Sequence, residues 1–390
     1  MQKNKIDVAA VATVRLSRIT KMRRSHRLLP SPAKAVNNNL QRTLKLRRNL
    51  SSAADTVTVT IAEAQATTKA ALKMIGWDDE DAGLQAEIMT AAELCGNNQG
   101  LVKMYQPALM APAPGTAKPT VERETSTSAV VNANQSPGML AAVMAADLAV
   151  KKVTSQDGPI AIVAAHNTST SSGQLAYYAE RMAKQGVIGI ALANSPEFVA
   201  AAAGGKAVFG TNPIAFGIPQ AAGPPLTFDM ATSAIALFGV LTAKAKGDPL
   251  PDGVAYAKDG SGYTTDAAEA LEGGSIATFG GHKGAGLSLM VELLAGVLSG
   301  GAVLGQVESK KVAKSWGHTL IAIQPEGLVD DFAGKASSVL QAVKASGPKI
   351  RIPGESSAKI AAERNASGTM PIPAKIWESI NLTAKEGLPK

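Results

Sequence analysis

The stretch from Pro159 to Ala193 places two short apolar runs on either side of an amphipathic segment. "PIAIVAA" and "VIGIALA" have the length and branched side chains of buried strands, and "QLAYYAERMAKQ" between them has the pattern of a helix that Gly186 closes. A strand, a helix and a second strand this close together indicate a crossover unit in a sheet that helices cover. This feature predicts a mixed α/β body for the chain.

Patterns on either side of this unit extend the prediction. "PLTFDM" and "TLIAIQ" are further strand patterns, and "GLSLMVELLAGVL" is a strongly apolar helix pattern. Thr60 and Glu63 form a capping box, which predicts a helix that stops at Gly76. A second helix is expected over residues 79–95, whereas the proline-rich residues 106–128 predict a long loop.

The net charge of +8 is concentrated in the first 54 residues. This segment contains thirteen Lys or Arg residues and one acidic residue, which leaves −4 for the rest of the chain. The charge of the body therefore gives no reason to expect nucleic-acid binding. The Arg-rich, acid-poor composition of residues 1–54 is typical of a disordered organelle transit peptide. We expect an address for the mitochondrial matrix; a plastid address and a plain basic tail are the alternatives.

Neither a metal site nor a membrane segment is indicated. One cysteine, Cys95, excludes an internal disulfide, and four scattered histidines do not supply metal-ligand spacing. Residues 286–305 have the length of a membrane span, but they include Glu292 and several glycines. A helix buried in the protein core is the better interpretation.

His166 stands where the first strand of the crossover unit ends. It is a candidate catalytic base, or only a polar residue at a strand end. The loop that follows, Asn167 to Gly173, is rich in hydroxyl side chains and includes Ser171. At the start of a helix such a loop could bind a phosphate or carboxylate, or it could simply cap the helix.

Two later stretches also carry candidate chemistry. Asp229 in "FDMATS" ends an apolar run, so its carboxylate could bind substrate, orient a catalytic group or cap the next helix. "GGHKGAGLSLM" surrounds His282 and Lys283 with glycines, which suits a contact with a phosphate or a nicotinamide ribose. Its spacing matches neither the dinucleotide-binding nor the P-loop pattern.

Together these stretches resemble the malate/L-lactate dehydrogenase family, which is unrelated to the Rossmann-fold enzymes of similar names. The blocks "GTNPIAFG", "DMATS" and "GGHKG" occur in the order of the family, and the resemblance covers about residues 57–389. It implies an α/β fold of three layers, α/β/α, with a mixed sheet and a cofactor domain that is not of the Rossmann type. It also implies a homodimer that uses NAD or NADP.

The resemblance also assigns domains and cofactor contacts. Residues 55–145, joined by residues 335–390, would form a helical substrate domain, and residues 146–334 would form the NAD(P)-binding domain. The positions that match cofactor contacts of the family are Ser195, Asp229, Met230, Ala231, His282, Lys283, Gly317 and His318.

The chain departs from the family at two histidines. The catalytic histidine of the family lies six residues ahead of the position of Tyr177, where this chain has Ser171, and His166 lies five residues earlier still. The resemblance places Ser171 at the substrate. His166, Ser171 and Asp229 are the catalytic candidates, and His282 is a further candidate for the proton carrier.

The second departure lies in the N-terminal domain. Asn98 and Gln99 replace a Ser-His pair, and Lys103 replaces an arginine suited to the substrate carboxylate. Gln99 and Lys103 are therefore expected at the substrate, although Lys103 cannot form the planar two-pronged contact of an arginine.

The predicted function is NAD(P)-dependent transfer of a hydride to or from a small 2-hydroxy or 2-oxo acid. Reduction of cyclic imino acids is the alternative, because a protonated imine needs less help from a general acid. A cofactor-binding relative without catalysis is the third possibility, against which the retained Lys283, Asp229 and "GTNP" block argue.

Overall fold

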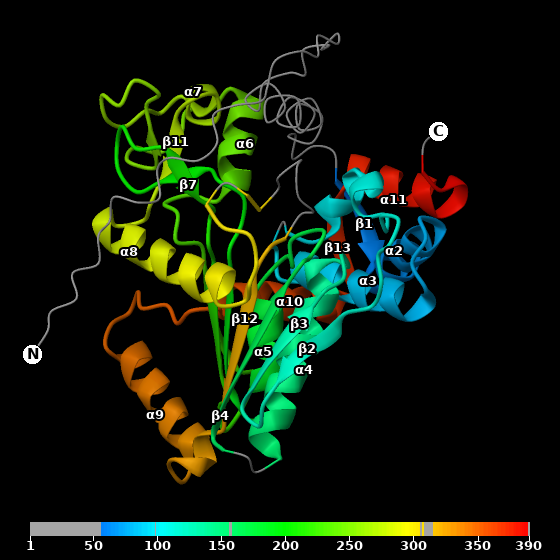
Figure 1. The fold of residues 1–390 in the computed structure, drawn as a ribbon, viewed down its shortest axis with the longest axis vertical. Coiled ribbons are helices and arrows are strands. Elements are labelled where there is room, and N and C mark those ends of the chain that lie inside the picture. The colour runs from blue at the N-terminus through cyan, green and yellow to red at the C-terminus, as the bar shows by residue number, and fades with distance from the viewer. Residues whose placement is uncertain (1–55, 98, 156–157, 305, 308–314, 389–390) are drawn as a thin grey trace, which may run out of the picture. The chain divides into compact units, whose positions relative to one another are not determined.

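The computed structural model describes residues 56–388, apart from residues 98, 156–157, 305 and 308–314 (Figure 1). The transit segment expected at residues 1–54 lies outside the described residues. Within the described part, no helix is long and apolar enough to cross a membrane. No group of three or more His, Cys, Asp or Glu side chains there is placed to hold a metal ion.

A seven-stranded mixed sheet forms the centre of the described region. Its strands, in spatial order, are β2 (Thr120–Glu124), β3 (Ser128–Asn132), β4 (Ile160–His166), β12 (His318–Ile323), β5 (Ile188–Ala193), β8 (Ile214–Ile218) and β9 (Leu226–Met230). β3 and β4 are parallel, and all other neighbours are antiparallel. The predicted strand, helix and strand are confirmed as β4, α5 (Ala176–Ala183) and β5, with β12 inserted between the two strands.

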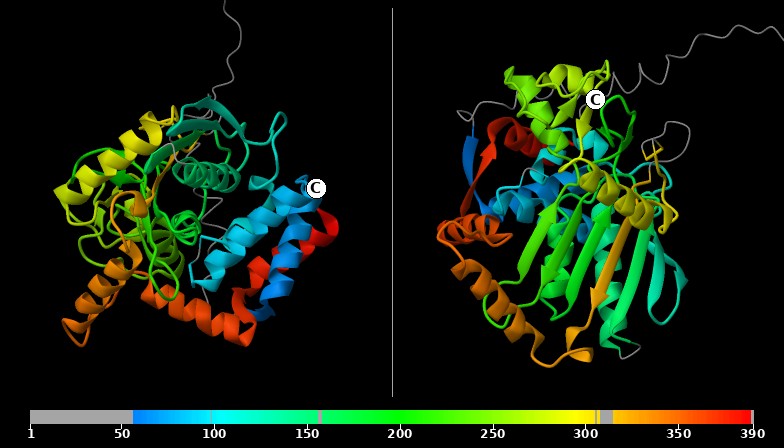
Figure 2. Two further views of the ribbon diagram at one scale, coloured as in Figure 1. Left: turned by 90° about the horizontal axis from the view of Figure 1, so that it is seen from below. Right: turned by 90° about the vertical axis from the view of Figure 1, so that its left-hand side faces the viewer.

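Helices cover both faces of this sheet. In β5, Ala191 and Ala193 belong to the core shared with α4 (Gly138–Thr154) and α5, whereas Ile190 and Leu192 pack against the end of α8 (His282–Val291). Successive residues of a strand point to opposite faces, so the predicted three-layer α/β/α arrangement is confirmed. Figure 2 shows α8 lying across one face of the sheet.

α8 is only half buried, which differs from the core helix that its composition predicted. Gly284, Ser288 and Val291 are buried, and the helix continues into a π-helical turn, η3 (Glu292–Val297). On its other side, Leu289 and Met290 are exposed. The apolar side chains of α8 therefore lie partly in the core and partly on the surface.

A smaller four-stranded sheet is built from the middle of the chain. Its strands, in spatial order, are β10 (Ala255–Tyr256), β11 (Ser275–Ala277), β6 (Val199–Ala200) and β7 (Ala207–Phe209). Together with α6 (Leu237–Lys246) and α7 (Ala267–Leu271), it encloses a core of its own around Val199 and Ile276.

The first and last described segments meet in a helical group. β1 (Thr56–Thr60) pairs with β13 (Thr369–Pro373), and α11 (Ala374–Glu386) packs against α2 (Ile61–Met74), which packs against α3 (Asp79–Leu94). The short helices η1 (Leu101–Tyr105) and η2 (Pro107–Leu109) lie against α11, and α10 (Glu355–Ser367) lies against α3. Thr60 is confirmed as the N-cap of α2, because its Oγ1 accepts the Glu63 N–H at 3.1 Å.

Residue 145, the last residue of the first segment of the expected substrate domain, lies inside α4, and β2 and β3 of the central sheet precede it. β2 also lies inside residues 106–128, where a loop was predicted, and all five of its residues are exposed.

The short helix η4 (Pro325–Gly327) follows β12. The next helix, α9 (Phe332–Ala345), contains no buried residue.

Candidate active site

Several residues predicted at the site lie at or next to one edge of the central sheet. His318, at the start of β12, pairs with Ala165 near the end of β4 and with Ala193 at the end of β5. Ile214, at the start of β8, pairs with Met230 at the end of β9. The segments that follow β4, β5 and β9 therefore meet those that precede β8 and β12, at the upper end of the sheet in Figure 1.

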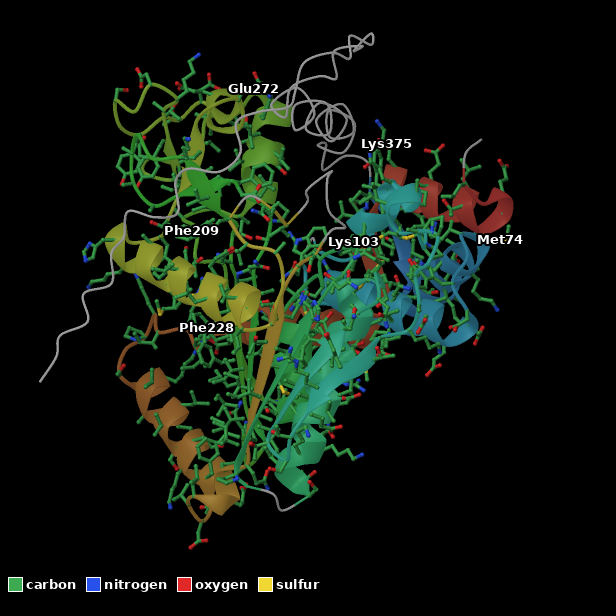
Figure 3. The ribbon with its side chains drawn as sticks, viewed as in Figure 1. Met74, Lys103, Phe209, Phe228, Glu272 and Lys375 are labelled. Carbon is green, nitrogen blue, oxygen red and sulfur yellow. The ribbon has the colours of Figure 1, made fainter. Side chains whose placement is uncertain are left out.

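Lys103 belongs to the helical group and lies on the side of it that faces the sheet (Figure 3). Its Nζ is 2.6 Å from Ser171 Oγ, in the loop before α5, although the two residues are 68 positions apart. Lys103 is partly buried, and this burial lowers the pKa of its ammonium to about 8. The structure thus joins two residues that the resemblance placed at the substrate.

A glycine fixes the position of η1, which carries Lys103. A Cβ on Gly100 would lie 2.1 Å from the carbonyl oxygen of Met89 and 3.0 Å from the Cβ of Ala92, both on α3. No side chain fits in that space, so only glycine allows the chain to approach α3 this closely. The close approach sets where η1 begins and hence where the Lys103 side chain points.

Gln99 faces the same loop through its backbone. Its carbonyl oxygen is 3.4 Å from the position that a Cβ on Gly173 would take. Its N–H donates to Asn97 Oδ1 at 2.9 Å, which shapes the turn ahead of η1. Asn98, which takes the place of the serine of the family, lies outside the described residues.

Asp229 satisfies the N-terminus of α5. Its Oδ2 accepts the Ala176 N–H at 2.9 Å. In the loop ahead of α5, the Thr168 hydroxyl is buried and exchanges hydrogen bonds of 3.1 Å with the Trp316 N–H and carbonyl. Asp229 therefore caps the start of α5, and the Thr168 hydroxyl holds the loop to Trp316. Ser171 is the hydroxyl of this loop that contacts a cation.

The Asp229 carboxyl holds its proton more tightly than an ordinary carboxyl. The surrounding protein raises its pKa to about 6, against a smaller lowering effect of the Ala176 and Leu175 amides. The residue itself remains exposed, so protein encloses the carboxyl on some sides while solvent reaches it from another. A carboxyl in this setting can exchange a proton near neutral pH.

His166 lies at the same edge but is turned toward the outermost strand. Its Nε2 is 2.8 Å from the Glu122 carboxylate, at the bulge of β2. Among the described residues, its imidazole forms no hydrogen bond with the hydroxyl groups of the loop that contains Ser171. The structure therefore brings His166 to an edge-strand carboxylate and not to the contact between Lys103 and Ser171.

The start of α8 is a helix N-terminus without a side-chain cap. Gly280 and Gly281 have φ angles of 57° and 62°, and no atom lies within 4 Å of where either would carry a Cβ. His282 and Lys283, the first two residues of the helix, are exposed. Unpaired N–H groups, the helix dipole and a lysine together suit an anion. These residues fit a phosphate group of NAD or NADP.

Ser195, Met230 and Ala231 border the site at the ends of β5 and β9. The Ser195 hydroxyl accepts the Thr211 N–H at 3.0 Å, which holds the "GTNP" segment against the end of β5. Met230 and Ala231 are half-buried. Ser195 thus has a structural partner in the chain itself, beside any ligand it contacts.

Gly317 and His318 lie beneath this edge. The Gly317 N–H donates to Asn194 Oδ1 at 2.7 Å. His318 is 1% exposed, and neither of its ring nitrogens forms a hydrogen bond with the described residues. Burial lowers the pKa of His318 to about 4, and the Trp316 backbone, outside hydrogen-bond geometry, opposes this only in part. The His318 side chain is therefore a neutral part of the core.

A buried carboxylate network that the sequence pattern did not indicate supports the site. Glu292 is 3% exposed, and it accepts hydrogen bonds from Asn212 Nδ2 at 2.8 Å, Asn194 Nδ2 at 3.3 Å and the Leu304 N–H at 3.1 Å. Asn194 follows β5 and Asn212 precedes β8, so the carboxylate ties two strand ends to η3. The available signal was a glutamate inside an otherwise apolar helix pattern.

Comparison with known proteins defines the class. A family model described as malate/L-lactate dehydrogenase matches residues 59–381, which is most of the chain. The chain therefore belongs to the malate/L-lactate dehydrogenase family and is an oxidoreductase, as the sequence motifs indicated.

Its relatives include proteins named for two kinds of substrate. L-sulfolactate dehydrogenase of Methanothermobacter thermautotrophicus is 36% identical over 273 residues, 68% of this chain and 77% of the relative. The Delta(1)-pyrroline-2-carboxylate/Delta(1)-piperideine-2-carboxylate reductase of Pseudomonas putida is 40% identical over 203 residues, 50% of this chain and 58% of the relative. The crystal structure of delta1-piperideine-2-carboxylate reductase from Pseudomonas syringae pvar. tomato superimposes with a TM-score of 0.77 and 30% identity, and the match covers 84% and 99% of the two chains.

Proposed function

We propose that this chain transfers a hydride between NAD or NADP and C2 of a small 2-hydroxy or 2-oxo acid. The contact between Lys103 and Ser171 carries the proposal, because it puts a cation and a hydroxyl together where an anionic substrate would meet both. The uncapped start of α8, with Lys283, supports a phosphate-bearing cofactor. The L-sulfolactate dehydrogenase relative is named for an acid of this class.

Reduction of cyclic imino acids is a second candidate. It is favoured by the relatives that are 38% to 40% identical and are named as pyrroline and piperideine carboxylate reductases. Ser171 in place of a catalytic histidine also suits a protonated imine, which needs no proton from the protein when it accepts hydride.

A substrate panel separates these candidates. The full chain, and a chain that begins at residue 55, would be mixed with NADH or NADPH and with 2-oxo acids or cyclic imines, while cofactor absorbance is followed. We expect oxidation of the cofactor by a 2-oxo acid. Activity on imines alone would favour the second candidate, and cofactor binding without any turnover would indicate a non-catalytic relative.

Replacement of Lys283 is expected to weaken cofactor binding more than folding. Lys283 is exposed, so Lys283→Ala loses little packing, but it loses a charged donor at the proposed phosphate position. A charge-assisted hydrogen bond is worth about 1.5–3 kcal/mol, which corresponds to roughly 10- to 150-fold in affinity. A fluorescence titration with NADH and NADPH measures the change. Lys359→Ala, which removes an exposed lysine of α10, is the control; equal affinity in both variants would refute the assignment.

We propose that the chain forms a homodimer through the exposed side of α8 and η3. Leu289, Leu293 and Val297 repeat every four residues and are 42%, 43% and 57% exposed, beside Met290 and Leu298. A continuous strip of exposed apolar side chains on a surface helix is typical of a protein interface. Most soluble oligomers pair identical surfaces.

A Val297→Asp chain is expected to sediment as a monomer at concentrations at which the wild type is a dimer, because a charge would be buried at the interface. Analytical ultracentrifugation measures the mass. Leu109→Asp, at an exposed apolar residue of η2, should leave the mass unchanged. A monomeric wild type would rule out the dimer proposal.

We propose that residues 1–54 direct the chain to the mitochondrial matrix, with the plastid as the alternative. The support is their composition, with thirteen Lys or Arg residues and one acidic residue. The N-terminal sequence of the protein isolated from its own cells would show whether this segment is removed.

A further inference from the structure

The contact between Lys103 and Ser171 has an unusual feature. A hydroxyl is the partner of the lysine, and no carboxylate among the described residues forms an ion pair with it. Partly buried lysines in proteins are usually paired with a carboxylate, which holds their charge. The charge of Lys103 is therefore not held by an opposite charge among the described residues.

We infer that Lys103 gives the proton to the substrate oxygen during reduction and takes it back during oxidation, in place of the missing histidines. This inference rests on the proposed function and deepens it. It changes the role expected from the resemblance, in which residue 103 only binds the substrate carboxylate.

Titration of Lys103 fits this role. Burial alone lowers its pKa to about 8, so both the charged and the neutral form are accessible near neutral pH. A general acid works best when its pKa lies near the working pH, because both protonation states are then accessible. An ordinary exposed lysine, with a pKa about two units higher, would rarely be neutral enough to accept a proton.

Charged groups on the neighbouring elements do not account for this pKa. Glu93 of α3 is buried, and Arg364 of α10 donates to the Glu93 backbone carbonyl. Lys375 and Glu378 lie on α11, which packs against η1. None of these four forms an ion pair with Lys103, and desolvation is the cause of its shift. The lysine can therefore gain or lose its proton without breaking a salt bridge.

The proposed step balances in atoms and charge. A bound NAD(P)H would supply the hydride that adds to C2 of the 2-oxo acid, while the Lys103 ammonium gives its proton to the C2 oxygen. The products are the 2-hydroxy acid, NAD(P)⁺ and a neutral Lys103 amine, which regains its proton from solvent. Ser171 Oγ, 2.6 Å from Nζ, is a positioning residue that holds the ammonium in place.

The histidines in the described part of the chain are less suited to this step. His166 is paired with Glu122, and His318 is buried and neutral. His282 is exposed at the start of α8, beside Lys283, where a phosphate is proposed. Lys103 is the titratable group that meets Ser171, which occupies the position of the catalytic histidine in the family.

Two substitutions separate proton transfer from carboxylate binding. Lys103→Arg keeps the positive charge, but an arginine does not lose its proton in proteins. Lys103→Met keeps most of the side-chain volume and loses both functions. With a 2-oxo acid, both variants should lose about 10²- to 10⁴-fold in kcat, while KM rises strongly only in Lys103→Met.

The pH dependence gives an independent readout. In the wild type, kcat/KM for reduction should fall as pH rises through about 8, because the acid must be protonated; oxidation should fall as pH drops through the same value. In Lys103→Arg, neither the fall of reduction at high pH nor the fall of oxidation at low pH should remain. NADPH affinity and melting temperature, measured for every variant, show whether each is folded and binds the cofactor.

The result that overturns the inference is a Lys103→Arg enzyme with kcat within about threefold of the wild type, which would leave Lys103 as a carboxylate binder. A wild type that reduces no 2-oxo acid would instead contradict the proposed function. In that case, competitive acetylation followed by mass spectrometry still measures the pKa of Lys103 in the full chain. A midpoint near 8 supports an exchangeable proton, and a midpoint above 10 overturns the inference.

Discussion

A Gly217→Ala chain is expected to unfold at a temperature well below that of the wild type. Gly217 lies in β8 under α5, and a Cβ there would be 2.1 Å from the carbonyl oxygen and 2.5 Å from the carbonyl carbon of Ala179. Both atoms are backbone, so the clash is relieved only if α5 and β8 move apart. Overpacking of this kind costs about 3 kcal/mol, which lowers the melting temperature by roughly 6–12 °C.

The same substitution should reduce activity. The first N–H of α5 is held by Asp229, and the loop before α5 carries Ser171 and so positions Lys103. A displacement of about 1 Å at a reacting group lowers turnover by about 10²-fold. Scanning calorimetry and the rate with a 2-oxo acid measure the two effects.

Gly83→Ala is the matched control, because Gly83 lies in α3 and its Cβ would meet only the flexible end of Lys69 at 3.6 Å. Alanine is favoured over glycine inside a helix, so this variant should be as stable as the wild type or up to about 1 kcal/mol more stable. Equal melting temperatures for Gly217→Ala and the wild type would show that α5 does not rest on this glycine.

The crossover unit was predictable because its signal is local. Residues 160–193 form two apolar strands and one amphipathic helix, and each is recognised from its own period. The order of strands in the sheet was not predictable in this way. β12 enters between β4 and β5 from far along the chain, and nothing in "HTLIAI" specifies its neighbours. β2 was missed because every residue of "TVERE" is exposed, so no alternation of apolar residues marks it.

The site shows the same division between local and distant information. The motifs placed Lys103 and Ser171 at the substrate through the resemblance, but their mutual contact joins residues 68 positions apart. The partner of His166 is Glu122, at a bulge of an edge strand that lies within the predicted loop of residues 106–128. A lysine that lacks a carboxylate partner is a property of the assembled structure. The sequence could not show this property, because it depends on which carboxylates the fold places too far from Lys103 to form an ion pair.

Glu292 has a larger role in the structure than its sequence context indicated. In the sequence, its charge within residues 286–305 indicated only that this stretch does not span a membrane. In the structure it holds the ends of two strands, and we expect Glu292→Leu to be the most destabilising exchange of a charged residue at the site. The substitution keeps the approximate volume but leaves amide donors of Asn194 and Asn212 and the Leu304 N–H without this acceptor.

Each buried donor left unsatisfied costs about 1–3 kcal/mol, and Asn194 and Asn212 keep second acceptors at Ala302 and Ser288. We therefore expect a loss of about 3–5 kcal/mol in the free energy of unfolding, or roughly 6–20 °C in melting temperature.

Glu378→Leu, at an exposed glutamate of α11, is the control and should change stability by no more than about 0.5 kcal/mol. Urea unfolding of the two variants, followed by far-ultraviolet circular dichroism, compares the buried with the exposed carboxylate. If Glu292→Leu were as stable as the control, hydrogen bonds to Glu292 would not hold β5 and β8 to η3. Packing against Val291 and Ala295 would then be the interaction that keeps this edge of the sheet together.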